Sequence, residues 1–113
     1  MASDTTKGGP AIVTAPQEID LSNVSEFENS LDKAIAQAPG GFIIDLTGTT
    51  YIDSAGVQAM LAAYSKDHVE DRKIAVVVGN SLVKSVLGVV HLEQLPGMYV
   101  FDDLNDAKQL LSR

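Results

Sequence analysis

Short apolar runs that alternate with segments of helical periodicity place the strongest constraint on how this chain can fold. The run KIAVVV (73–78) is almost wholly apolar and rich in β-branched residues, which predicts a strand buried on both faces of a sheet. Strand–helix alternation at this spacing favours right-handed crossovers, so we expect an α/β fold with a mainly parallel sheet packed against helices. The four predicted strands are AIVTA (11–15), GFIIDL (41–46), KIAVVV (73–78) and MYVF (98–101).

Each predicted strand is followed by a segment with the sequence pattern of a helix. In the first of these segments, apolar residues recur every three or four positions and form one stripe, and Ser22 is the predicted N-cap. Pro39 ends that helix, and Ser81 is the predicted N-cap of the third helix. The predicted helices cover residues 22–38, 54–68, 82–91 and 103–113.

The length of the chain and its N-terminal composition indicate a single domain with a short tail. A chain of 113 residues suffices for one hydrophobic core, and we assign that domain to residues 11–113. Residues 1–10 are small and polar, which predicts a flexible tail. They lack the apolar segment of a secretory signal, and the longest apolar runs are far below the ~20 residues that span a bilayer. We therefore expect a cytoplasmic protein without a membrane span.

Charge and cysteine content exclude several kinds of partner and site. The net charge of −7 repels nucleic-acid phosphates and anionic lipid headgroups, and the eight Lys and Arg residues are scattered, so we expect no nucleic-acid partner. There is no cysteine to form a disulfide or a thiolate metal site. His68 and His91 lie far apart and outside any metal-ligand spacing, so we expect no bound metal.

The motifs of common catalytic and cofactor-binding sites are missing from the sequence. No glycine-rich phosphate loop opens a helix after a strand, and no Gly-x-Ser-x-Gly elbow surrounds a serine. The acidic pair of a phosphoryl-accepting receiver domain is also absent, since Asp45 is followed by Leu46 and lies within a predicted strand. We therefore expect a chain without enzymatic activity and without a cofactor.

The segment TYIDSAGVQAML (50–61) joins a strand exit to a helix and carries an acid, a hydroxyl and a glycine. Asp53 and Ser54 are both favoured N-caps, since a side-chain oxygen can accept a hydrogen bond from a free first-turn N–H. The same N–H groups and the helix dipole also accommodate an anion, so a phosphate on Ser54 would be tolerated there. Gly56 either permits close packing or leaves the backbone approachable to a kinase. On these residues alone, a structural and a regulatory interpretation of the joint both stay open.

The same joint carries a family resemblance. IIDLTGTTYIDSAGVQAMLAAY (43–64) resembles the strand, polar turn, Asp-Ser-x-Gly joint and helix of the anti-sigma factor antagonists, small stand-alone STAS domains of bacterial partner-switching systems. EID (18–20) is similar to the acidic loop of that family, NSLVKSVLGVVHL (80–92) to its third helix, and VFDDLNDAKQLL (100–111) to its last strand and helix. Family members open with two strands, of which only 11–15 is clear here. The resemblance implies a STAS fold, with a single mainly parallel or mixed sheet of about four to five strands packed with about four helices.

The resemblance also implies a regulatory mechanism. Members of the family bind an anti-sigma factor, often a serine protein kinase with a GHKL-type ATP site, and thereby release a sigma factor. The kinase phosphorylates the serine of the joint, which lowers affinity, and a serine phosphatase restores it. By this resemblance Ser54 is the phosphoacceptor, and the partner surface comprises Asp20, Asp53, Ser54 and Gly56.

Two other functions stay open for such a domain. One is a STAS scaffold that is not phosphorylated and belongs to a sensory or membrane-associated assembly; the presence of Ser54 argues against it. The other is a nucleotide- or small-ligand-binding STAS domain, which the missing phosphate-cradling loop argues against. Ala55, where the family commonly has a second hydroxyl residue, leaves Ser54 as the only hydroxyl in the joint.

Overall fold

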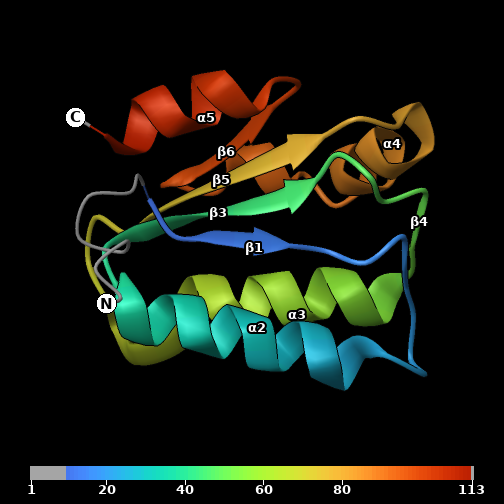
Figure 1. Ribbon diagram of the computed structural model, residues 1–113, viewed down its shortest axis with the longest axis horizontal. Helices are drawn as coiled ribbons and strands as arrows, with labels where there is room; N and C mark the ends of the chain where they lie inside the picture. Colours follow the sequence, from blue (N-terminus) through green and yellow to red (C-terminus); the bar gives the residue numbers. More distant parts are fainter. Residues whose placement is uncertain (1–9, 113) are drawn as a thin grey trace, which may run out of the picture.

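A parallel four-stranded sheet forms the centre of the protein (Figure 1). The computed structural model describes residues 10–112, so residues 1–9 of the predicted tail lie outside the described residues. Neighbouring strands follow the order β1-β3-β5-β6, and every pair is parallel, which confirms the prediction from strand–helix alternation. The strands are β1 (Ile12–Thr14), β3 (Gly41–Leu46), β5 (Lys73–Val78) and β6 (Met98–Phe101), and the last three have the predicted bounds.

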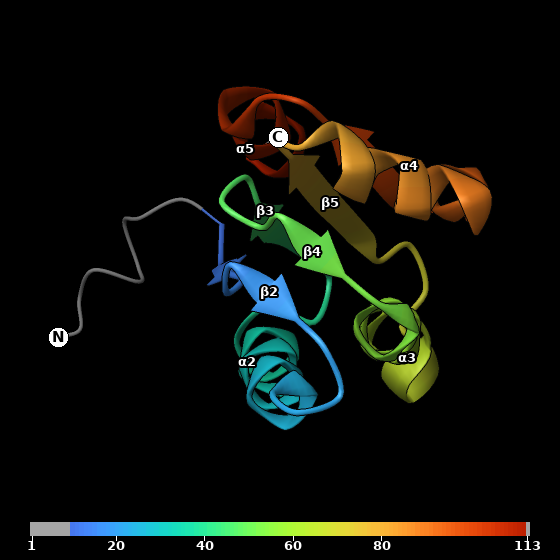
Figure 2. The ribbon, with the colours of Figure 1, turned by 90° about the vertical axis from the view of Figure 1, so that its right-hand side faces the viewer.

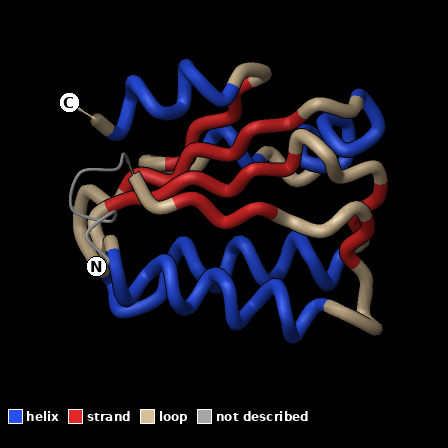
Figure 3. The backbone as a smooth tube through the Cα atoms, in the orientation of Figure 1, coloured by secondary structure: helices blue, strands red, loops and turns tan. Residues whose placement is uncertain are grey.

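Helices cover both faces of the sheet, which forms the middle layer of three (Figure 1, Figure 3). α2 (Val24–Gln37) and α3 (Ser54–Ser65) lie side by side on one face, and α5 (Leu104–Leu111) covers the other. α4 (Ser81–Val89) follows β5, and the short 3₁₀ segment η2 (Leu92–Gln94) leads from it to β6. Four α-helices in the described residues, packed on a parallel sheet, confirm the predicted fold class.

Each face of the sheet has its own hydrophobic core. Alternate side chains of β3 point to opposite faces: Phe42, Ile44 and Leu46 belong to the core beneath α2 and α3. Ile43 belongs instead to the smaller core beneath α5. All residues of β5 after its first are buried, which confirms the prediction of a strand covered on both faces.

A second, smaller sheet joins the two segments that carry the predicted site. β2 (Glu18–Ile19) and β4 (Tyr51–Ile52) pair in parallel, with Ile19 opposite Ile52. Figure 2 shows the two short strands side by side, with α2 and α3 on one side of them and α4 on the other. The sequence predicted a loop after Pro16 and no separate strand before the joint, and both assignments are corrected by the short strands β2 and β4. The domain therefore opens with two strands, β1 and β2.

The N-caps of two helices differ by one residue from the predicted ones. α2 follows Asn23 in the N-cap position rather than Ser22, whose hydroxyl donates to a neighbouring carboxylate. α4 starts at Ser81 itself, because Asn80 is the N-cap and its side-chain oxygen accepts hydrogen bonds from two N–H groups of the first turn. In both cases an asparagine, not the predicted serine, holds the capping position.

The ends of the helices also fall short of the prediction. α3 ends at Ser65 rather than at 68, and the 3₁₀ segment η1 (Lys66–His68) follows it. Within η1, Asp67 has a φ of 61°, and a residue in this left-handed conformation cannot continue a right-handed helix. α4 and α5 end at Val89 and Leu111, two residues before the ends of the segments assigned to them.

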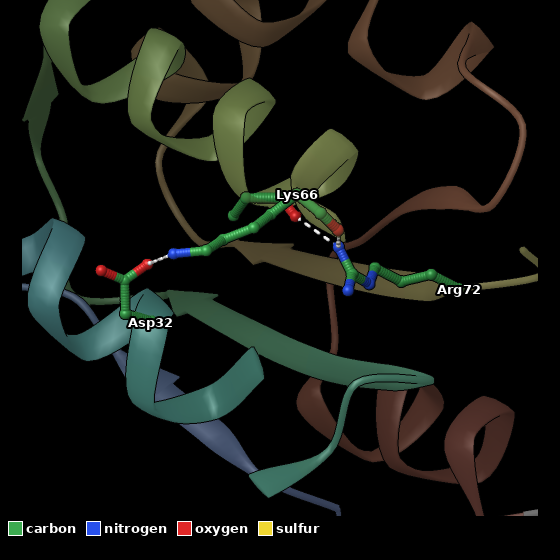
Figure 4. A network of polar contacts seen from close by, with 4 residues as sticks. Asp32, Lys66 and Arg72 are labelled. Carbon is green, nitrogen blue, oxygen red and sulfur yellow. Dashed lines mark hydrogen bonds and ion pairs between the residues drawn. The ribbon is translucent and has the colours of Figure 1, made fainter. Parts of the chain in front are cut away.

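Arg72 fixes the C-terminal end of α3 (Figure 4). Its side chain is buried, its Nε donates to the carbonyl of Pro39, and its Nη1 donates to the carbonyls of Ala63 and Lys66, each at 2.8 Å. The last carbonyls of a helix have no partner within the helix, so Arg72 supplies one. Lys66 also pairs with Asp32 of α2 at 3.0 Å, an exposed contact that contributes little stability. Arg72 thus holds one end of the helix whose other end carries the Asp-Ser joint.

Candidate functional site

Asp53, not Ser54, caps the N-terminus of α3. Asp53 has extended backbone angles, φ −105° and ψ −172°, and its carboxylate accepts a hydrogen bond from the N–H of Ala55 at 2.9 Å. Ser54 is the first residue of the helix and is exposed. Among the hydrogen bonds within residues 10–112, none involves the Ser54 hydroxyl. The cap that the sequence left open between two neighbours therefore belongs to Asp53.

Asp20 lies in a loop that is held by its own hydrogen bonds. One carboxylate oxygen accepts from both the hydroxyl and the N–H of Ser22. The N–H of Asp20 donates to the Asn23 side-chain oxygen at 2.9 Å, and the Asn23 amide donates to the carbonyl of Glu18 at 2.7 Å. The Ser22 hydroxyl, and after it the Ser22 N–H, stabilises the charged form and lowers the pKa of Asp20 below its ordinary value. The loop therefore presents a negative charge at neutral pH.

The pairing of β2 with β4 brings this loop next to the joint. The N–H of Asp53 donates to the carbonyl of Ile19, the residue before Asp20, at 3.1 Å. Because the two strands are parallel, both chain segments leave the pair at the same edge. The structure thus brings the Asp20 loop to the start of α3, beside Asp53 and Ser54, although the two segments are far apart in the sequence.

Gly56 is buried beneath the same pair of strands. A Cβ atom at this position would lie 2.7 Å from side-chain atoms of both Ile19 and Ile52. Of the two roles that the sequence left open, this geometry supports close packing. It corrects the expectation of an approachable backbone, because the strands cover the glycine. Its missing side chain lets the first turn of α3, with Ser54, lie directly against the strands.

Gly56→Ala should lower the free energy of unfolding by about 1–3 kcal/mol, the usual cost of overpacking a tight contact. The added methyl group would meet side chains on both strands of the pair, so relief of the clash would disturb their register. Urea unfolding followed by circular dichroism measures this change. Gly88→Ala in α4 is the matched control, because a Cβ there meets nothing within 4 Å, and it should be neutral or stabilising. Unchanged stability of Gly56→Ala would contradict the close approach.

Two polar residues that the sequence did not single out support the site. Asn23 bridges the two ends of the Asp20 loop. Thr49 is fully buried, and its hydroxyl donates to the carbonyl of Pro16 at 2.8 Å, which ties the turn before β4 to the turn before β2. Threonine in a polar turn and asparagine before a helix are common, so the sequence carries no signal that distinguishes them.

Two further features are absent from the part of the chain that the structure describes. It contains no group of three or more His, Asp and Glu side chains arranged to hold a metal ion. No helix within residues 10–112 has the length and apolar character needed to cross a membrane. The candidate site consists of the carboxylates of Asp20 and Asp53, the hydroxyl of Ser54 and the buried Gly56.

Comparisons with known proteins agree with this fold. The anti-sigma-F factor antagonist RsfB of two strains of Mycobacterium tuberculosis is 27% identical over 99 residues, which cover 88% of this chain and 79% of RsfB. The crystal structure of an anti-sigma factor antagonist from Mycobacterium paratuberculosis matches with a TM-score of 0.83 over 94% of this chain and 88% of that chain, at 21% identity. A family model described as STAS domain matches residues 2–107. Because that match spans nearly the whole sequence, the chain belongs to the STAS domain family.

Proposed function

We propose that this protein is an anti-sigma factor antagonist, which binds an anti-sigma factor and thereby releases a sigma factor. The name of the curated relative supports this class of partner. The observation that carries the proposal is the exposed Ser54 hydroxyl beside a helix cap that Asp53 already provides. A serine without a capping role, on an ordered and exposed joint, is available for modification in the folded state.

In this proposal Ser54 is the phosphoacceptor of a partner that is itself a serine protein kinase with a GHKL-type ATP site. A phosphate at the start of α3 faces first-turn N–H groups and the positive end of the helix dipole, which stabilise a negative charge by about 0.3–1 kcal/mol. The fold therefore tolerates the modification. The added charge of about −1.5 to −2 acts on the surface that the partner contacts, and a serine phosphatase reverses it.

Asp20 and Asp53 complete the proposed partner surface. Both follow the paired strands β2 and β4 at one edge, and both carboxylates are charged at neutral pH, as is usual for aspartate. Such a surface attracts a basic patch, and the net charge of −7 speeds the encounter with a basic partner. Gly56 contributes from beneath, by allowing Ser54 to lie beside the two carboxylates.

Phosphorylation by the anti-sigma factors of the source organism tests this proposal. Each anti-sigma factor with a kinase domain is purified and incubated with the full-length chain and ATP, and mass spectrometry counts and locates the phosphates. We expect one phosphate, on Ser54, and none on the Ser54→Ala variant. Ser81→Ala is the matched control, because Ser81 is also exposed and is the first residue of a helix capped by Asn80. It should be phosphorylated like the unmodified sequence.

Three results would contradict different parts of the proposal. Binding without phosphorylation would favour a STAS scaffold that is not phosphorylated. Neither binding nor phosphorylation with any anti-sigma factor would overturn the antagonist function itself. Phosphate on Ser81 as well as on Ser54 would mean that the kinase phosphorylates any exposed serine at the start of a helix and does not specifically recognise the joint beside Asp20 and Asp53.

A further inference from the structure

Helix α4 has two apolar faces, and only one of them is buried. Val83 and Leu87 face the core, and 1% of each is exposed. Leu82, Val86 and Val89 recur at spacings of four and three and form a second face, here called the α4 stripe. Leu82 is 71% exposed and Val89 is 77% exposed. Val86, between them, is half-buried and packs against the core. Exposed apolar side chains gathered on one face mark an interaction surface.

Two grooves flank the α4 stripe. The first has a volume of about 350 Å³ and lies between the stripe and Tyr51 of β4. The second has a volume of about 430 Å³ and lies between the stripe and α3, and Asp53 and Ser54 line one end of it. Both grooves include Val86 and Val89, so together they form one continuous apolar surface. That surface reaches the phosphorylation site proposed above.

Charge around these grooves is confined to one end. Among the described residues that line them, Asp53 is the one with a charged side chain, and Asp20 follows the neighbouring strand. Lys84 of the same helix lines neither groove and pairs with Asp102 at 3.1 Å. A partner that is complementary to this surface therefore has apolar side chains that contact the α4 stripe and a positively charged group that contacts Asp53.

On the basis of the proposed function, we infer that the α4 stripe and its grooves bind an amphipathic helix of the anti-sigma factor. In helix-in-groove recognition an amphipathic helix lays its apolar face into an apolar groove, and the α4 stripe with its two grooves provides such a surface. α4 has 9 residues and is about 13 Å long, so two to three turns of a partner helix cover it. A basic residue at one end of that helix meets Asp53 and Asp20. A second copy of this chain, with its net charge of −7, offers no such excess of positive charge.

The position of the groove gives the proposed phosphorylation a direct physical effect. A phosphate on Ser54 would stand at the end of the second groove, where a bound helix has to cover it. Burying a charged group without a partner is costly, and the neighbouring Asp53 adds like-charge repulsion. Phosphorylation would therefore weaken binding at one end of the apolar surface that contacts the partner helix.

Calorimetric titration of the full-length chain with each purified anti-sigma factor of the source organism tests the inference. The double variant Leu82→Ser/Val89→Ser removes two mostly exposed side chains, so its melting temperature should stay near that of the unmodified sequence. We expect its Kd for the anti-sigma factor to rise at least ~10-fold. Val89→Glu should weaken binding at least as much. Gln109→Glu on α5 is the charge-matched control, and its Kd should change less than ~2-fold.

Hydrogen exchange of the unmodified chain supplies a readout that needs no variant. In the complex, the amides of α4 should exchange more slowly, whereas those of α5 should not change. Unchanged affinity of the double variant, with α4 unprotected, would overturn the inference and leave the proposed function intact, because the unmodified chain still binds. Failure of every anti-sigma factor to bind the unmodified chain would overturn both. A further result would be a dimer of the unmodified chain, with the double variant monomeric but unchanged in its affinity for the anti-sigma factor. That result would assign the stripe to self-association; it would overturn the inference and leave the proposed function intact.

Discussion

Replacing Arg72 by methionine should lower the free energy of unfolding by about 2–4 kcal/mol. The guanidinium donates hydrogen bonds of 2.8 Å to the carbonyls of Pro39, Ala63 and Lys66, and only 3% of the residue is exposed. Methionine fills much of the same volume but donates no hydrogen bond. Each bond from a charged donor is worth about 1.5–3 kcal/mol, and Ala63 still accepts one from the N–H of Lys66. Removal of the buried charge offsets part of this loss, because Nη2 has no partner among the described residues.

Thermal and urea unfolding measure the effect of this substitution, and the melting temperature should fall by about 10 °C for a domain of this size. Lys73→Met is the matched control, because Lys73 is the next residue, is exposed and loses the same charge. Surface substitutions of this kind usually change stability by less than ~0.5 kcal/mol. If both variants were equally stable, Arg72 would not be the residue that anchors the end of α3.

The parallel sheet could be predicted because its central strands carry an unambiguous pattern. β3 and β5 have six residues each, and β5 is apolar on both of its faces. That pattern is typical of a strand covered by helices on both sides, and the helical segments between the strands supply those helices. Parallel neighbours connected by helices then favour a single handedness of crossover. Local signals and tertiary packing agree here, so the sequence was sufficient.

The small sheet of β2 and β4 could not be predicted from its residues. Each strand has two residues, which is too short for alternation of apolar and polar side chains to be recognised. Ile19 and Ile52 pair although they are distant in sequence, and no local feature marks that contact. The site nevertheless depends on it, because this pairing is what places Asp20 beside Asp53 and Ser54.

The capping residues were missed for a related reason. Serine and asparagine are both favoured N-caps, so a local rule cannot choose between Ser22 and Asn23 or between Asn80 and Ser81. Contacts outside the helix make the choice in the first case, because the Ser22 hydroxyl donates to the carboxylate of Asp20. The same limit applied to Asp53 and Ser54, and only the hydrogen bond to the first turn of α3 assigns the cap to Asp53.

The exposure of the α4 stripe could not be predicted from the sequence either. Its side chains have the residue types and spacing of a core-facing helix, and so do the side chains on the buried face of the same helix. Nothing local distinguishes the two faces, because both consist of leucine and valine. The distinction requires the orientation of α4 against β4 and β5, which tertiary packing sets.

Phosphorylation of Ser54 should weaken binding to the anti-sigma factor at least ~30-fold, or about 2–5 kcal/mol. In the complex, a dianion would stand beside the carboxylates of Asp53 and Asp20, at the end of an apolar groove that suits a neutral hydroxyl. In the free protein, water and the first turn of α3 stabilise the same charge. Phosphorylation therefore favours the unbound state and leaves the fold intact, so circular dichroism of the two forms should be nearly the same.

Titration calorimetry of the unmodified chain, its phosphorylated form and the variants with one anti-sigma factor measures this switch. Ser54→Ala should bind like the unmodified chain and resist the kinase. Ser54→Asp should bind with intermediate affinity, since a carboxylate carries about half the charge of a phosphate. Asn105→Asp is the control: it adds a carboxylate to the first turn of α5, on the opposite face of the sheet, and should change Kd less than ~2-fold. Equal affinities of the unmodified, phosphorylated and Ser54→Asp forms would place Ser54 outside the partner surface, because a charge that the partner covers cannot leave its affinity unchanged.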